Sequence, residues 1–145
     1  MIEERYCSYE VARLLKEKGF NEECHHIYIE SRQIYVGIIL EWTNTIYGED
    51  AMSNNEIPDV DTDIITAPTH QMACDWLMEK DIYISPKYSW FRSRKGAPHY
   101  EWKPVVLRLS TGNIIYPQLL DMCEYYKTYG EAVDAAIKYS LGNLV

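Results

Sequence analysis

The sequence lacks a long hydrophobic run. Its longest apolar stretch covers residues 36–40, far fewer than the roughly 18 that a membrane-spanning helix requires. The chain begins with a charged segment, Met-Ile-Glu-Glu-Arg, where a secretory signal peptide would have an apolar core. We therefore predict a cytoplasmic protein that makes no contact with a membrane.

Closely spaced cysteines are also missing. The cysteines Cys7, Cys24, Cys74 and Cys123 are scattered, and no two of them form a C-x-x-C pair. A chain of 145 residues can bury roughly 68–70% of the surface that it exposes when unfolded, so its fold requires neither a disulfide nor a structural metal. We predict reduced thiols in a reducing compartment.

Short catalytic and cofactor-binding motifs are absent as well. The sequence has no G-x-G-x-x-G, no Walker loop and no G-x-S-x-G. Cysteine catalysis needs a thiolate with a histidine base in reach, and no local signature of this kind surrounds any of the cysteines. We predict no catalytic residue and no cofactor. An unrecognised hydrolase stays as a third alternative, behind the two binding functions given below.

One group of acidic residues has the beginning of a calcium-binding pattern. Asp59, Asp61 and Asp63 alternate like the first ligands of a calcium loop. The sixth position of that loop would be Ile64 instead of glycine, and the twelfth would be His70 instead of glutamate. A solvated acidic segment is the favoured interpretation, and weak binding of a divalent ion stays open.

Two groups of soft ligands are too small for a zinc site. Cys24, His25 and His26 are adjacent, and His70 precedes Cys74 by one helical turn. Two ligands at the latter spacing can share a metal, but zinc needs three or four. Cys74 also borders the apolar stripe of its helix, which favours a buried structural thiol. We predict no metal site.

Composition and length indicate one ordinary globular domain that spans residues 1–145. Hydrophobic residues make up 47% of the chain and charged residues 25%, as in a typical folded domain. The formal net charge of −8 disfavours general attraction to nucleic acid or to anionic membranes, although it leaves room for a local basic patch.

Three helices are predicted from caps and apolar stripes. The first covers residues 8–20, and the second follows Pro68 and carries Trp76 and Leu77 on its apolar stripe. The third begins with a capping box in residues 128–131. The predicted N-caps are Ser8 for the first helix, Thr66 or Thr69 for the second, and Thr128 for the third.

Alternating β-branched and aromatic residues predict four strands in two hairpins. These strands cover residues 27–29, 34–42, 82–91 and 100–109, with Pro104 marking an edge or a bulge. Residues 117–126 are ambiguous between helix and strand, and Pro117 favours a short helix. The order predicts an α+β fold: an antiparallel sheet of about four strands with three main helices packed on one face.

Residues 43–66 form the one long segment without a regular pattern. The segment contains six acidic residues and no basic residue, together with Gly48, Pro58 and several asparagines that break regular structure. A loop of this length in a compact domain is usually functional or mobile. We predict an acidic irregular loop over residues 43–66.

Three stretches of the chain have a familiar pattern: the N-terminal helix of residues 8–20, the Ala-Pro-Thr helix with its Trp-Leu pair in residues 67–77, and the terminal helix in residues 126–137. Together they resemble a group of small proteins carried by phages and prophages of gut bacteria. These stretches consist of caps and core stripes, so they specify fold and bring no catalytic residue. The resemblance implies a phage-derived accessory protein that works in the cytoplasm of a bacterial host.

The remaining signal is a basic, aromatic hairpin in residues 85–108. Six basic residues and a single acidic one give this segment a net charge of +5, against −13 for the rest of the chain. Aromatic residues alternate with the bases, a pattern that suits base stacking with phosphate contact. A hairpin that packs one face and solvates the other explains the same pattern and is the favoured interpretation. The residues predicted to contact a partner or nucleic acid are Tyr88, Trp90, Arg92, Arg94, Lys95 and Trp102.

These observations predict a non-enzymatic binding protein of phage type, an accessory factor that contacts an unknown host or phage macromolecule. The alternative is a weak single-stranded nucleic-acid-binding protein that uses the basic aromatic hairpin. Retention on heparin or oligonucleotide columns at low salt distinguishes the two.

Overall fold

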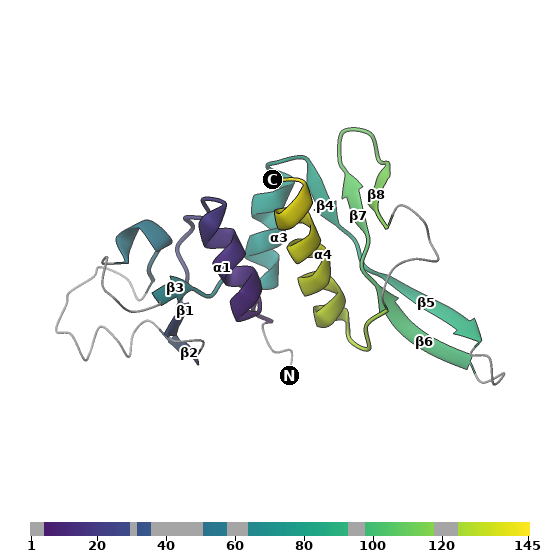
Figure 1. Cartoon of the computed structure of the whole chain (residues 1–145), viewed down its shortest axis with the longest axis horizontal. Helices are drawn as coiled ribbons and strands as arrows, with labels where there is room; N and C mark the ends of the chain where they lie inside the picture. The colour runs from purple at the N-terminus through teal and green to yellow at the C-terminus, as the bar shows by residue number, and fades with distance from the viewer. Residues whose placement is uncertain (1–4, 30–31, 36–50, 58–63, 93–97, 118–124) are drawn as a thin grey trace. The chain divides into compact units, whose positions relative to one another are not determined.

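The computed structural model describes residues 5–29, 32–35, 51–57, 64–92, 98–117 and 125–145 (Figure 1). For residue 35, residues 89–92 and residues 98–100 only the backbone is described. The chain divides into two compact units, Met1–Met72 and Ala73–Val145, and each is described by itself. The single domain predicted from the length stays a prediction.

The first unit begins with helix α1, Tyr9–Glu17, as the sequence predicts. The Ser8 hydroxyl accepts a hydrogen bond from the backbone amide of Val11 at 3.3 Å, so the predicted N-cap is confirmed. After the helix, Gly19 adopts a φ of +93°, a left-handed conformation that glycine tolerates best. The buried side chains of α1 are Val11, Ala12 and Leu15.

The first unit also contains a three-stranded antiparallel sheet with the order β2–β1–β3. Its strands are β1 (His26–Ile29), β2 (Arg32–Tyr35) and β3 (Ile64–Thr66). Strand β3 lies in the segment predicted to be irregular. The strand forms antiparallel backbone pairs with β1. Its Ile65 packs with Tyr28, Ala67 and Ala12 in one buried cluster.

A second part of the predicted irregular loop is packed as well. Residues 51–54 are buried, and Met52 and Cys24 exchange two backbone hydrogen bonds of 2.9 Å. The 3₁₀ turn η1, Asn54–Glu56, places the Asn54 amide inside the unit. Its Nδ2 donates to the Phe20 carbonyl at 2.8 Å, and its Oδ1 accepts from the Thr66 amide at 3.0 Å. One buried asparagine therefore joins the segment that follows α1 to β3.

Helix α3, His70–Met78, is the predicted second helix. Of the two threonines considered as its cap, Thr69 is the one that accepts a hydrogen bond from the Met72 amide, at 3.2 Å. Trp76 and Leu77 are buried as predicted. The helix is followed by Asp81, which has a φ of +66°.

The Asp81 carboxylate fixes the turn after α3. It accepts hydrogen bonds from the Ser110 hydroxyl at 2.6 Å and from the Ser110 amide at 2.7 Å, and Arg108 lies 3.7 Å away. The hydrogen bond from the Ser110 hydroxyl is the main reason that the pKa of Asp81 is lowered. The turn is thus tied to the strand that ends near Ser110.

The second unit contains the sheet β4–β7–β8 and the ribbon β5–β6, all antiparallel. The strands are β4 (Ile82–Ile84), β5 (Lys87–Arg92), β6 (Pro98–Lys103), β7 (Val106–Arg108) and β8 (Ile114–Tyr116). The two predicted strands of the second hairpin are each interrupted at a proline, which divides them into β4 and β5 and into β6 and β7. Strand β8 is additional to the predicted four.

The last helix is α4, Tyr129–Asn143. The Thr128 hydroxyl accepts from the Glu131 amide at 3.1 Å, which confirms Thr128 as the N-cap. The buried side chains of α4 include Val133, Ala136, Ile137 and Leu141. Within this unit, α4 contacts β4 and β6.

The α+β class, the antiparallel pairing and the three main helices are therefore confirmed. The single sheet of about four strands is wrong, because the described residues form two three-stranded sheets and one two-stranded ribbon. Breaks at the prolines separate the second hairpin into two parts. Of the ambiguous segment 117–126, residues 118–124 lie outside the described residues.

No helix among the described residues has both the length and the apolar character needed to cross a membrane.

Candidate functional site

The ribbon β5–β6 gathers aromatic side chains around Trp102. The Trp102 ring lies 5.0 Å from the Tyr88 ring, tilted by 51°, and 5.0 Å from the Tyr129 ring in an edge-to-face arrangement. Both distances lie within the range of favourable aromatic pairs. We call Tyr88, Trp102, Tyr126 and Tyr129 the aromatic surface.

Backbone pairing positions three members of this surface side by side. Tyr88 is directly opposite Trp102 in the β5–β6 register. On the other side of β6, Trp102 and Tyr126 exchange two backbone hydrogen bonds of 2.7 Å each. The Thr128 cap then starts α4 so that Tyr129 lies in its first turn. The positions of these rings follow from a strand register and a helix start.

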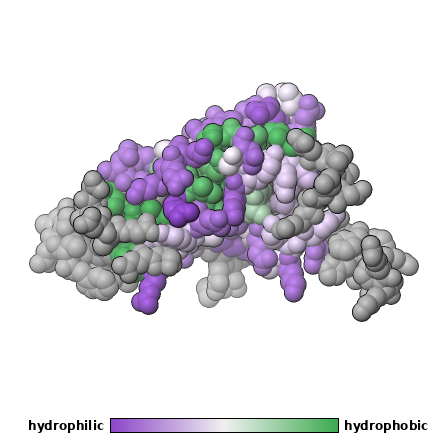
Figure 2. All heavy atoms as spheres, in the orientation of Figure 1, coloured by the Kyte–Doolittle hydropathy of each residue, from purple (hydrophilic) through white to green (hydrophobic). Residues whose placement is uncertain are grey.

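The outer members of the aromatic surface are open to solvent. Tyr88 is 57% exposed and Tyr129 is 44% exposed, while Trp102 between them is half-buried. Figure 2 shows hydrophobic residues at the surface among hydrophilic ones. Among the described residues, the large hydrophobic side chains that are most exposed all belong to the second unit: Met78, Tyr83, Tyr88, Leu109, Ile114 and Tyr129.

The predicted contact residues divide into three groups. Tyr88 and Trp102 are brought together, as the sequence pattern requires. Trp90 and Arg92 lie on β5, opposite Tyr100 and Pro98 in the backbone register. Their positions have the same strand parity as Tyr88. The two remaining predictions, Arg94 and Lys95, lie outside the described residues.

Sequence reasoning missed Tyr126 and Tyr129 as members of the surface. The capping box does place Tyr129 in the first turn of the last helix, so its exposure at that helix start could have been inferred. The bridge between Trp102 and Tyr126 could not, because it joins segments that are 24 positions apart in the sequence through backbone hydrogen bonds.

The charge of the chain is divided between the two units. The first unit carries fourteen acidic and five basic residues, a net of −9, and the second carries eight acidic and nine basic residues, a net of +1. The second unit therefore holds nine of the fourteen basic residues of the chain. On the ribbon itself, Lys87 is exposed at the position next to Tyr88.

Two of the cysteines are in the wrong state for nucleophilic catalysis. Burial, with a smaller contribution from the charge of Glu22, raises the pKa of the Cys24 thiol from an ordinary 9.0 to about 11. Burial raises the pKa of Cys74 to about 11 in the same way, with a further contribution from Asp75. Both thiols are protonated at neutral pH, and a protonated thiol is a poor nucleophile and metal ligand. Cys123 lies outside the described residues.

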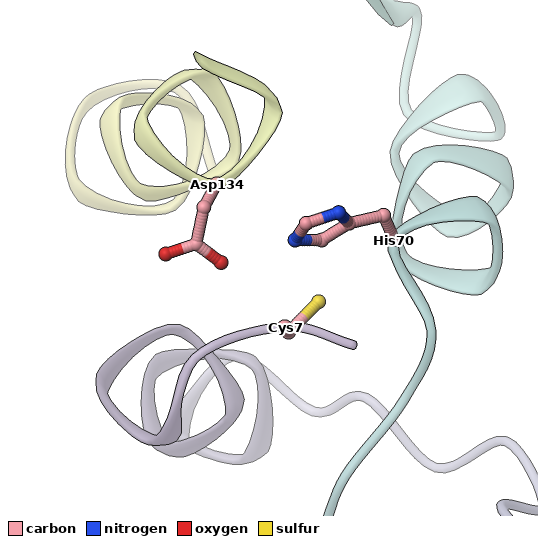
Figure 3. A group of neighbouring side chains, drawn as sticks. All are labelled: Cys7, His70 and Asp134. Carbon is pink, nitrogen blue, oxygen red and sulfur yellow. The ribbon is translucent and has the colours of Figure 1, made fainter. Parts of the chain in front are cut away.

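A cysteine and a histidine do meet in the first unit, although not the pair that the sequence suggested. The chain from Arg5 to Cys7 pairs with the segment before α3: Cys7 N donates to Pro68 O at 2.9 Å, and His70 N donates to Arg5 O at 2.9 Å. Figure 3 shows the Cys7 and His70 side chains pointing toward each other, and Cys7 Sγ lies within 4.8 Å of a His70 ring nitrogen.

The Cys7–His70 pair is placed where chemistry on a substrate is difficult. Cys7 is fully buried, and its thiol faces the Thr69 carbonyl at 3.8 Å. Two side chains provide fewer ligands than a zinc site requires. Asp134, which Figure 3 also labels, belongs to α4 in the second unit. The pair is best explained as part of the packing that holds the N-terminal segment against the start of α3.

The possible divalent-ion ligands of the acidic segment, Asp59, Asp61 and Asp63, lie outside the described residues.

No protein-family model, no curated protein and no solved structure matches this chain.

Proposed function

We propose that this chain is a non-enzymatic binding protein that contacts another macromolecule through the aromatic surface of its second unit. The observation that carries the proposal is the exposure of Tyr88 and Tyr129 on either side of Trp102. Aromatic side chains are enriched at interfaces because they supply a large contact area at a low cost in conformational entropy.

The placement of these rings supports a binding role over a purely structural one. A ribbon that only packed its aromatic face would bury the outer rings and leave the polar face in water. Here the central ring is half-buried and the outer rings are exposed. The resemblance to small phage and prophage proteins adds the expectation of an accessory role in the cytoplasm of a bacterial host, which forms part of the proposal.

Site-specific photocrosslinking tests this function. The photoreactive amino acid p-benzoylphenylalanine replaces Tyr88, Tyr129 or, as a control, Tyr83. Tyr83 is a 40% exposed tyrosine on β4 of the same unit, outside the aromatic surface. We expect one common adduct from positions 88 and 129 in a lysate of a gut bacterium, and a much weaker adduct from position 83.

Competition makes the result specific. Excess unlabelled wild-type protein should suppress the adduct, and excess Trp102→Ala protein should not. If all three positions react equally, or if none reacts, the aromatic surface is not an interface and the proposal fails.

A further inference from the structure

We infer that the partner of the aromatic surface is single-stranded nucleic acid, whose bases stack on Tyr88 and Tyr129. This inference rests on the proposed function, because it names the class of molecule that the surface would bind. Single strands expose the faces of their bases, whereas a duplex stacks those faces against each other. Stacking on aromatic side chains is tolerant of sequence because every base has a flat π-face.

The geometry offers two stacking positions and not a single ring. Tyr88 and Tyr129 each lie 5.0 Å from Trp102, so their centroids are at most 10 Å apart. At about 3.4 Å per nucleotide along a stacked strand, this distance corresponds to roughly three nucleotides. The rings are tilted by 51° and 82° from the plane of Trp102, so a strand that contacts both must turn as it passes Trp102.

Local charge favours a polyanion over a protein. The cores of protein–protein interfaces are depleted in lysine, but the hairpin of residues 85–108 carries a net charge of +5 within an otherwise acidic chain. Of its six basic residues, Lys103 is buried and Arg108 lies 3.7 Å from Asp81, so the other four supply the charge that a phosphate would meet. The exposed Lys87 directly precedes Tyr88 in β5 and so belongs to the opposite face of the ribbon, whereas Arg92 lies four positions from Tyr88 with the same strand parity. The strongly acidic first unit, at a net −9, repels nucleic acid and leaves this hairpin as the attractive region.

The expected binding is weak and depends on salt. One ribbon covers only about two to four phosphates, and each phosphate contact with a single strand contributes about −0.7 to the slope of log affinity against log salt. Affinity should therefore fall roughly 7- to 50-fold between 50 and 200 mM salt.

Quenching of tryptophan fluorescence tests the inference with the purified full chain. The probes are a twelve-residue oligothymidine, a twelve-residue oligouridine and a duplex of twelve base pairs, all at low salt. We expect both single strands to quench the fluorescence and the duplex to quench it much less. Tyr88→Ala and Tyr129→Ala should each weaken binding by roughly 5- to 150-fold, as the loss of one stacked base does.

Two variants separate loss of stacking from loss of fold. Tyr88→Phe keeps the ring and should keep the affinity within about twofold, because stacking does not use the hydroxyl. Tyr83→Ala removes a tyrosine that is 40% exposed and lies outside the aromatic surface, and it should leave binding unchanged. Equal losses in the Tyr83 and Tyr88 variants would overturn the inference.

Failure of this inference is distinguishable from failure of the proposed function. If neither single strand binds at low salt while positions 88 and 129 still crosslink to one protein, the interface is real and its partner is a protein. If the crosslinked adducts disappear on nuclease treatment, the nucleic-acid partner is supported directly.

Discussion

Pro86 lies opposite Pro104 in the register of the second hairpin. Ile84 pairs with Val106, and Lys87 pairs with Lys103. Two residues on each strand lie between these pairs, so the register is the same on both sides of the prolines. Within this interval, Ser85 donates to the Val105 carbonyl at 2.9 Å. Since hydrogen-bonded pairs alternate with non-hydrogen-bonded ones, the two prolines share a position where an N–H would face away from the partner strand.

The two prolines interrupt the hydrogen bonds between the strands without shifting the strand register. Proline holds φ near −65°, whereas an antiparallel strand prefers about −140°, so both strands depart from regular geometry at the same level. The ribbon that carries Tyr88 and Trp102 therefore begins as a separate pair from the sheet β4–β7–β8, while the register still sets Tyr88 opposite Trp102.

Replacing both prolines should join the two parts. In the double variant Pro86→Thr, Pro104→Thr, the strands can adopt regular angles and Val105 N–H can donate to Ser85. Because a hydrogen bond contributes about 1 kcal/mol, we expect the Val105 amide to exchange about fivefold more slowly. Hydrogen exchange followed by NMR measures this rate. Pro98→Thr, at the far end of β6, should leave it unchanged, and the same rate in the double variant as in the wild type would contradict the argument.

Asn54 should be essential to the first unit in a way that its neighbour is not. Asn54→Ala leaves the Phe20 carbonyl and the Thr66 amide without their buried partner. Each unsatisfied group costs about 1–3 kcal/mol, so the free energy of unfolding should fall by at least about 2 kcal/mol. Urea denaturation followed by circular dichroism measures the change.

Asn55 provides the matched control. Its side chain is exposed, and the hydrogen bond that its backbone amide donates to Asn21 Oδ1 survives truncation of the side chain. Asn55→Ala should change the free energy of unfolding by less than about 0.5 kcal/mol. Equal destabilisation by both variants would show that the two hydrogen bonds of the Asn54 side chain are not what stabilises this segment.

The helices could be predicted from the sequence because their determinants are local. The side chains of Ser8, Thr69 and Thr128 each accept a hydrogen bond from the backbone amide three residues later in the chain. A few consecutive residues therefore suffice to predict each helix start. The strand pairing of the second hairpin was also accessible, since its two halves are close in sequence and alternate clearly.

The rest depended on contacts between distant segments. Strand β3 contains three residues, too few to show the alternation of apolar and polar residues that predicts a strand. It forms because Ile65 and Thr66 pair with Tyr28 and Ile27. The aromatic surface is similar: Tyr88 and Trp102 follow from the hairpin, but Tyr126 joins them through a backbone bridge. Cys7 and His70 meet for the same reason, through pairing across 63 positions, and no spacing rule would have suggested them.

The raised pKa values of buried Cys24 and half-buried Cys74 predict a characteristic pH dependence. In the unfolded chain Cys24 and Cys74 ionise near the ordinary value of 9.0, whereas in the fold their pKa is about 11. Below pH 9 both states hold the proton and the stability does not depend on these groups. Between pH 9 and 11 the unfolded state loses the proton first, so stability falls as pH rises, by on the order of 3 kcal/mol for each thiol.

Alkylation with iodoacetamide measures the same shift directly. At pH 8 the folded thiols hold about 100-fold less thiolate than unfolded ones, so variants that retain only Cys24 or only Cys74 should react about 100-fold more slowly than in urea. A rate in the native protein that matches the rate in urea would mean that these thiols are not protected by burial.

The N-cap of α4 should affect both stability and the aromatic surface. The Thr128 hydroxyl accepts from the Glu131 amide at 3.1 Å, and the next residue, Tyr129, packs edge-on against Trp102. Thr128→Ala removes the cap and should cost about 1 kcal/mol, the typical value for a lost N-cap. Because the first turn then frays, the Tyr129 ring should lose its fixed position beside Trp102. Near-ultraviolet circular dichroism should therefore weaken under conditions where the protein is still folded.

Ser8→Ala is the matched control for this prediction. Ser8 caps α1 with the same geometry, through a hydrogen bond of 3.3 Å from the Val11 amide, but it belongs to the first unit. It should also cost about 1 kcal/mol and leave the near-ultraviolet spectrum of the tryptophans unchanged. If both variants alter the spectrum alike, the change reports general loosening of the chain. If only Thr128→Ala alters it, the helix start is what holds Tyr129 in the aromatic surface, and the same variant should also weaken the crosslink from position 129.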